Sequence, residues 1–232
     1  METHHLCVGS YDSSTLALTK GQKKADKEPD VTKFPTIEYQ NRKPTNLTAK
    51  QQKPRKKHNS PRSPAITENM DQILLNSDWE LRLPALPIAK SVAVVIGEVT
   101  NAQAHFSEDE SRIYSEFKFR VDEVLKNLEQ PFSDSIVVER LGGRAKFPSG
   151  KVVVSSVAHQ DLPQVGKRYI LFLTHEYAGD DDYTILTGYE LRNGLVFPLD
   201  KPGTGHPILS YNGVAETTLR NDLVVALTNI SQ

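Results

Sequence analysis

The sequence predicts a mainly β protein, an antiparallel barrel of about five to seven strands with one C-terminal α-helix and a disordered N-terminal arm. Three observations support this fold class. Residues 113–121 alternate between a mainly apolar face and a mainly polar face. Short apolar runs recur through residues 92–197, separated by turn residues and with no helical pattern between them. Apolar residues then recur at threes and fours over residues 216–230, which is the spacing of a helix.

Residues 113–125 (IYSEFKFRVDEVL) carry the clearest strand signal. Successive side chains of a strand point to opposite faces, so one face is expected in the core and the other in water. The core face would hold Ile113, Ser115, Phe117, Phe119 and Val121, and the outer face Tyr114, Glu116, Lys118, Arg120 and Asp122. Residues 92–96 (VAVVI) are apolar on both faces, which is typical of a central strand. We expect the two strands to pair antiparallel across the polar connection at 100–111.

Further strands are predicted from the apolar runs at 136–140, 152–154, 168–173, 183–189 and 195–197. The dipeptide Asn193-Gly194 favours a two-residue hairpin turn, because both residues tolerate positive φ. In the predicted helix, Thr217 or Thr218 could cap the first turn. Residues 92–232 are therefore expected to form one β-barrel domain that ends in a helix at about 216–230.

Residues 71–91 are interpreted as a strap or linker that leads into this domain. Residues 71–79 could form one or two helical turns, and Trp79 is expected to pack on the core. Pro84 and Pro87 exclude a helix interior at 83–88, because proline lacks the backbone donor and restricts the residue before it. We expect this stretch to cross the core in an extended conformation.

The charge is distributed unevenly along the chain. Residues 1–67 hold thirteen Lys and Arg against six Asp and Glu, a net charge of +7, whereas residues 68–232 have a net charge of −8. Residues 1–70 also lack periodicity and have few apolar residues, which predicts a disordered basic arm. Its most basic part contains Lys53, Arg55, Lys56, Lys57 and Arg62. The arm could be an electrostatic contact for nucleic acid or another anionic surface, or a solubilising tail that lies on its own acidic domain.

Four stretches together carry a family resemblance: VAVVIGEV (92–99), YSEFKFRVDEVLK (114–126), SIVVER (135–140) and VGKRYILFL (165–173). In their order and apolar spacing they resemble the OB-type barrel of netrin/TIMP-like (NTR-like) domains. They are also similar to uncharacterised bacterial secreted or envelope proteins. The resemblance covers about residues 90–190 and implies a fold only. Protease inhibition by the TIMP-like route is not implied, because that route uses an amino-terminal cysteine and the predicted domain contains none.

The sequence predicts no metal, cofactor or catalytic centre. The candidate clusters are all placed in loops: His105 with Glu108, Asp109 and Glu110, His159 with Asp161, and His175 with Glu176. Zinc-protease, serine-hydrolase and phosphate-loop motifs do not occur, and Asp180, Asp181 and Asp182 lack the spacing of a calcium loop. Loop histidines are more simply explained as surface residues.

Three functions remain compatible with the sequence. The preferred one is a non-catalytic binding or interaction module whose partner is a protein or a surface. The second is single-stranded nucleic-acid binding through the basic arm and an outer face made of Tyr114, Lys118 and Arg120. The acidic charge of residues 68–232 disfavours it, because phosphate affinity comes from Lys and Arg. The third is a hydrolase that uses the loop histidines.

The sequence does not determine the cellular compartment of the protein. The first twenty residues contain no apolar run long enough for a signal peptide, and no stretch approaches the ~18 apolar residues of a membrane span. As written, the chain is expected to be soluble and not exported by the general route. A long unstructured segment before a folded domain would also be consistent with a misassigned start codon. In that case the family resemblance would suggest an exported or envelope protein.

Overall fold

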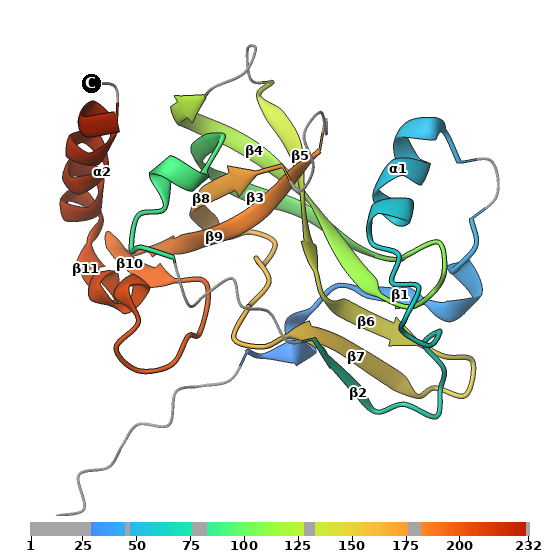
Figure 1. Cartoon of the computed structure of the whole chain (residues 1–232). Coiled ribbons are helices and arrows are strands. Elements are labelled where there is room, and N and C mark those ends of the chain that lie inside the picture. Colours follow the sequence, from blue (N-terminus) through green and yellow to red (C-terminus); the bar gives the residue numbers. More distant parts are fainter. Residues whose placement is uncertain (1–28, 45–46, 76–82, 128–132, 176–181, 231–232) are drawn as a thin grey trace, which may run out of the picture.

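The computed structural model describes residues 29–44, 47–75, 83–127, 133–175 and 182–230 (Figure 1). Strands hold 43% of the described residues and helices 19%, so the prediction of a mainly β protein is confirmed. Eleven strands form two sheets among the described residues, more than the five to seven predicted. Within the same residues, neither α-helix combines the length and the apolar content needed to cross a bilayer.

The larger sheet contains seven strands in the order β11-β10-β9-β5-β4-β3-β8. In addition β8 pairs with β9, so five of the strands (β3, β4, β5, β9 and β8) pair in a closed cycle. All neighbours in this cycle are antiparallel except β5 and β9, which are parallel. The seven strands are β3 (Ala93–Phe106), β4 (Ile113–Asn127), β5 (Ser135–Leu141), β8 (Arg168–Thr174), β9 (Tyr183–Arg192), β10 (Leu195–Pro198) and β11 (Val214–Ala215).

The alternation predicted for β4 is confirmed. Phe117 and Phe119 are fully buried and pack in a core with Val95, Val99 and residues of β8, whereas Lys118 and Arg120 are exposed. The pairing of β3 with β4 contains three register shifts, and Gly97 lies at one of them. A Cβ atom on Gly97 would lie 1.9 Å from the carbonyl oxygen of Arg120, so only glycine allows the two backbones this approach.

A second sheet has the order β1-β6-β7-β2 and was not predicted as a separate unit (Figure 1). Its strands are β1 (Thr36–Glu38), β6 (Gly143–Lys146), β7 (Val152–Val157) and β2 (Gln72–Leu75). The hairpin of β6 and β7 lies in the centre, and each outer strand adds to it in parallel. Its core includes Ile37, Ile66, Phe106 and Phe147.

The predicted C-terminal helix is confirmed as α2 (Glu216–Ile230). Leu219 and Leu223 are buried and pack with Ile88, Val94 and Ile170. The helix begins at Glu216, so Thr217 and Thr218 lie inside its first turn and neither is the cap. The 3-10 helices η4 (Ile88–Lys90) and η5 (Pro207–Tyr211) precede it in the chain.

The helical turn predicted in residues 71–79 is wrong for the part that the structure describes. Residues Gln72–Leu75 form strand β2, because they pair with β7, a partner that the local sequence does not indicate. Trp79 lies outside the described residues. Residues 83–87 are not helical, and Leu83 and Ile88 are buried.

The prediction of disorder over residues 1–70 is wrong for residues 29–44 and 47–70. They form the 3-10 helices η1 (Val31–Lys33) and η2 (Tyr39–Asn41), strand β1 and helix α1 (Ala49–Lys57). Phe34, Ile37 and Ile66 are buried and anchor this segment in the core. These three apolar residues do not hold the segment alone, because Lys57 and Ser60 also form polar contacts with distant residues of the chain. Residues 1–28 lie outside the described part of the chain.

Candidate functional site

A buried carboxylate joins α1 to the larger sheet. Glu139 of β5 is 1% exposed, and Lys57 Nζ at the end of α1 donates to its Oε1. His58 Nε2 lies 3.3 Å from Glu139 Oε2, and Thr184 Oγ1 of β9 lies 3.1 Å from Lys57 Nζ. Burial alone would raise the pKa of Glu139, but His58 and Lys57 outweigh it and hold the pKa below its usual value.

An aromatic stack lies beside this carboxylate. The ring of Tyr114 lies 4.5 Å from the ring of His58 and 5.3 Å from the ring of His105. Tyr114 points outward from β4 as predicted, yet the residues that cover it leave it 1% exposed. Burial accordingly raises the pKa of its hydroxyl group. Tyr114 is therefore part of the contact between the N-terminal segment and the sheet.

The basic segment also binds the acidic loop between β3 and β4, at residues 107–112. The backbone N–H of Glu108 donates to the carbonyl of Arg55 at 3.0 Å. The N–H of Ser60 donates to Asp109 Oδ2 at 2.7 Å. Burial opposes ionisation of Asp109, but hydrogen bonds from Ser111, Ser107 and the Ser60 backbone lower its pKa overall. Arg42 Nε and Lys43 Nζ lie 3.3 and 3.0 Å from the carboxylate of Glu110, so the uneven charge of the chain is partly neutralised inside the molecule.

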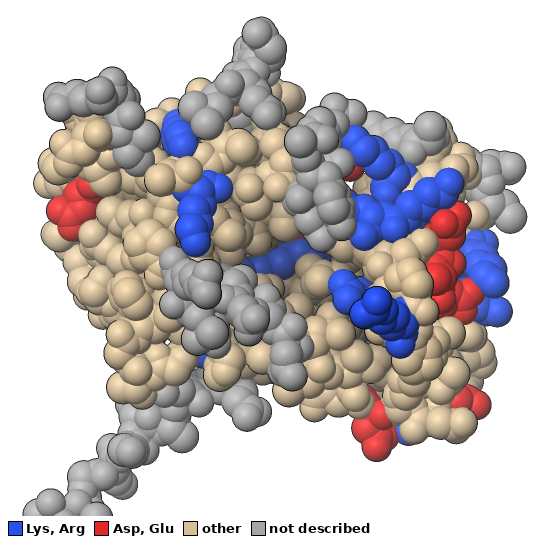
Figure 2. Space-filling model, viewed as in Figure 1, with Lys and Arg blue, Asp and Glu red and all other residues tan. Residues whose placement is uncertain are grey.

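A groove opens on the outer side of this junction. Its main pocket has a volume of about 660 Å³ and lies between the N-terminal segment and the paired ends of β3 and β4. A second hollow of about 330 Å³ shares Lys43, Pro44, Leu47 and Arg55 with it, so we treat both as one α1 groove. The side chains that carry its chemistry are Lys43, Arg55, Gln103, His105, Tyr114 and Glu116. Figure 2 shows Lys and Arg side chains gathered over the α1 side of the molecule, with acidic side chains beside them.

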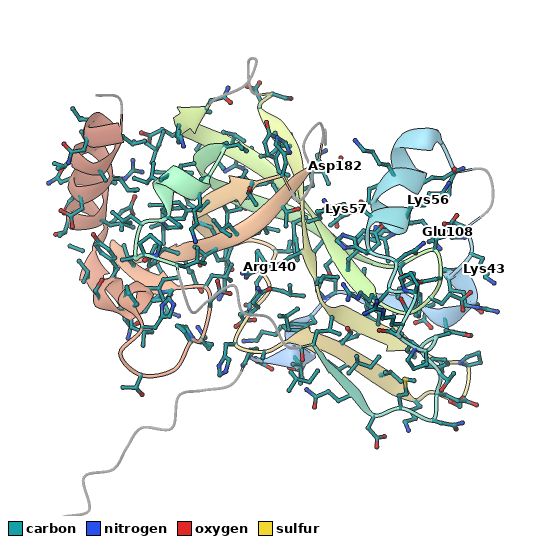
Figure 3. The ribbon with its side chains drawn as sticks, in the orientation of Figure 1. Lys43, Lys56, Lys57, Glu108, Arg140 and Asp182 are labelled. Carbon is teal, nitrogen blue, oxygen red and sulfur yellow. The ribbon has the colours of Figure 1, made fainter. Side chains whose placement is uncertain are left out.

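Arg55 is the unusual residue of the α1 groove. It is 6% exposed, and its Nη2 donates to the carbonyl of Arg42 at 2.7 Å. Its Nη1 is buried without a hydrogen-bond partner, and no carboxylate of the described residues forms an ion pair with it. Arg140 offers a comparison, because it is 2% exposed and binds both oxygens of Asp200, at 2.7 and 3.0 Å. Figure 3 shows Arg140 in the interior, away from α1, and Lys57 between α1 and the strands.

The predicted face of Tyr114, Lys118 and Arg120 does not form one exposed surface. Tyr114 is buried, Lys118 is exposed, and Arg120 pairs with Glu98 at 2.9 Å and with Asp122 at 3.2 Å.

The residues of the predicted electrostatic arm are partly buried and partly exposed. Arg55 and the side chain of Lys57 are buried, while Lys53, Lys56 and Arg62 are exposed.

The three histidines weighed as loop residues each have contacts of their own. His105 belongs to strand β3 and lies 3.4 Å from Glu116, His159 contacts the carbonyl of Lys201, and His175 stacks on Tyr183. No group of three or more metal-binding side chains occurs in the described ranges. Sequence reasoning missed His58 and Glu139. The only signal was that Glu139 alternates with the core residue Val138 and so points outward.

Comparisons with known proteins add no family to this description. No protein-family model, curated protein or solved structure matches the chain. The resemblance to netrin/TIMP-like domains and to bacterial envelope proteins therefore stays a prediction.

Proposed function

We propose that the chain is a non-catalytic binding module, built on an OB-type barrel, that holds a small polar ligand in the α1 groove. The strand pairing supports the barrel. In the closed cycle the first strand (β3) pairs with the second (β4) and the fourth (β8), and the third (β5) pairs in parallel with the fifth (β9). This is the connectivity of an OB-type Greek-key barrel, a fold that binds ligands through its second and third strands and adjoining loops.

The position of the α1 groove supports the same proposal. It opens beside β4, the second strand of the cycle, and reaches Glu108 in the loop that joins the first strand to the second. In OB folds the second strand and this loop both contribute to ligand sites. Its volume of about 660 Å³ lies within the ~300–1,000 Å³ of typical small-molecule pockets. Beside the groove, the N-terminal segment covers β4 at Tyr114 and β5 at Glu139. The observation that carries the proposal is an open, polar pocket built around a buried arginine without a counter-ion.

The other two functions have less support. Base stacking on the outer face requires an accessible Tyr114, but this ring is packed between His58 and His105. A hydrolase that uses loop histidines requires them to act together, but His105, His159 and His175 contact different partners on different elements.

The proposal can be tested by NMR titration of the full ¹⁵N-labelled chain. The probes are inorganic phosphate, succinate, glucose, putrescine and a single-stranded oligothymidine. At least one small probe is expected to shift the backbone amides of Lys43, Gln103 and Glu116 in a saturable way. If only the oligonucleotide binds, with shifts centred on Lys118, the nucleic-acid alternative replaces the proposal. Hydrolysis of p-nitrophenyl acetate that disappears in His105→Ala would instead favour the hydrolase.

A further inference from the structure

We infer that the ligand of the α1 groove carries an oxyanion, a phosphate or carboxylate group of a small molecule, and that Arg55 is its main donor. This inference rests on the proposed binding function and adds the chemical class of the ligand.

A buried guanidinium group is ordinarily paired, because removing a charge from water is costly unless an opposite charge or hydrogen bonds replace the solvent. Arg140 follows this rule through Asp200. Arg55 does not, since its only side-chain hydrogen bond in the described chain goes to a neutral carbonyl of Arg42. That single bond nevertheless fixes the orientation of the guanidinium plane. The free Nη1 is therefore held in a defined position, as a site for an anion requires.

The acidic side chains that line the groove have other partners. Glu116 lies 3.4 Å from His105 Nε2, and Glu38 lies 3.3 Å from Lys146 Nζ. Glu108 lines the smaller hollow, and its carboxylate accepts from Asn59 Nδ2 at 3.5 Å. None of these carboxylates forms an ion pair with Arg55 in the described residues, so the charge of Arg55 is available to a ligand.

Further donors surround the same space. His105 Nε2 is buried and has no partner with hydrogen-bond geometry, although Glu116 is near. The packed ring of Tyr114 holds the imidazole of His105 in place. The amide groups of Gln40, Asn41 and Gln103 and the ammonium group of Lys43 also line the pocket. An oxyanion has several acceptor sites, so it could be bound by Arg55 and by two or three of these groups together.

The test uses the full chain and two kinds of oxyanion. Inorganic phosphate and succinate are titrated separately at constant ionic strength, with glucose and putrescine as neutral and cationic controls. We expect saturable binding of at least one oxyanion with amide shifts at Lys43, Gln103 and Glu116. Tighter binding of phosphate than of succinate, or the reverse, shows which of the two groups the natural ligand carries.

Variants of the groove separate this inference from misfolding. Arg55→Gln should weaken oxyanion binding by about tenfold or more, since a hydrogen bond to a charged group is lost. Glu116→Gln should strengthen it several-fold, because a negative charge leaves the pocket. A damaged protein would not show such a gain. Lys118 lies on β4 like Glu116, but it is exposed and lies outside the groove. Lys118→Gln should therefore leave the affinity for the oxyanion unchanged.

The failures of the two proposals can be told apart. Groove shifts with glucose or putrescine but with neither oxyanion would overturn the oxyanion inference and leave the binding function standing. No groove shift with any small probe would overturn both. An oxyanion effect that Lys118→Gln weakens as much as Arg55→Gln would show general electrostatic attraction and would also overturn the inference.

Discussion

Lys57 and Glu139 form an ion pair across 82 residues of sequence, with side chains that are only 5% and 2% exposed. The pair connects a segment without apolar periodicity to the outer face of β5. Thr184 of the neighbouring strand and His58 complete the contacts of the carboxylate. The docking of α1, and with it the shape of the α1 groove, therefore depends on ionic contacts more than on an apolar helix face.

Lys57→Met should destabilise the protein by about 3 kcal/mol or more, because it removes the ammonium group that donates to the buried carboxylate of Glu139. Lys56→Met, on the exposed neighbour, should change the free energy of unfolding by less than about 0.5 kcal/mol. Urea denaturation of both variants measures the difference. Equal midpoints for the two variants would mean that the buried pair does not form.

Acidification should destabilise the wild type through Glu139. Its pKa is lowered from the ordinary value of 4.5 by His58 and Lys57, after the opposing effect of burial. The unfolded chain therefore takes up a proton at a higher pH than the folded one, and the stabilisation is lost as the pH falls below 4.5 through the folded pKa. Denaturation midpoints measured between pH 7 and pH 3 should fall less steeply for Glu139→Gln. A wild-type profile as flat as that of the variant would contradict the assignment.

Phe117→Ala and Phe119→Ala should each cost about 3–5 kcal/mol, the usual range for truncation of a buried phenylalanine. Lys118→Ala lies between them, faces solvent, and should cost less than about 0.5 kcal/mol. Chemical denaturation of the three variants checks the alternation of β4. A Lys118→Ala midpoint as low as the other two would show that the register is wrong.

The sequence predicts most strands of the larger sheet and α2, because β4 and α2 have a period that burial imposes on one face, while β3 and β8 contain dense apolar runs that are buried on both faces. Residues 113–125 and 216–230 are the clearest examples. It does not predict the N-terminal segment, because its buried residues Phe34, Ile37 and Ile66 are too few and too unevenly spaced to form a pattern. The α1 groove also escaped prediction, since it forms only where residues 40–55 meet β3 and β4. The outward direction of Tyr114 was predictable, but its cover by His58 was not.

Removal of residues 1–67 should lower the stability of the remaining chain, in contrast to the expectation from sequence. The truncation removes Phe34, Ile37 and Ile66 from the core and Lys57 and His58 from Glu139. In the full chain, Ile66→Ala alone should cost about 2–5 kcal/mol. Thr67→Ala, on the exposed neighbour, is the matched control and should have little effect. A truncated chain with the midpoint of the full protein would refute the docking of the segment.

The buried ion pair of Arg140 and Asp200 allows the cost of removing a counter-ion to be measured as a change in the free energy of unfolding. Asp200 is fully buried, and it also accepts hydrogen bonds from Thr187 Oγ1 at 2.7 Å and from the backbone N–H of Asp161 at 3.1 Å. Asp200→Asn keeps the shape but removes the carboxylate that binds both Nη atoms of Arg140, so it should cost about 3–5 kcal/mol.

Asp222→Asn is a suitable control, since Asp222 is exposed on α2 and its hydrogen bond with Tyr211 is exposed to solvent. Thermal and urea denaturation should separate the two variants clearly. Saturating phosphate or succinate should stabilise the wild type through Arg55, yet should not restore the stability lost in Asp200→Asn, because Arg140 lines no part of the α1 groove. Rescue of Asp200→Asn to the wild-type midpoint by either anion would place the oxyanion at Arg140 instead of at Arg55.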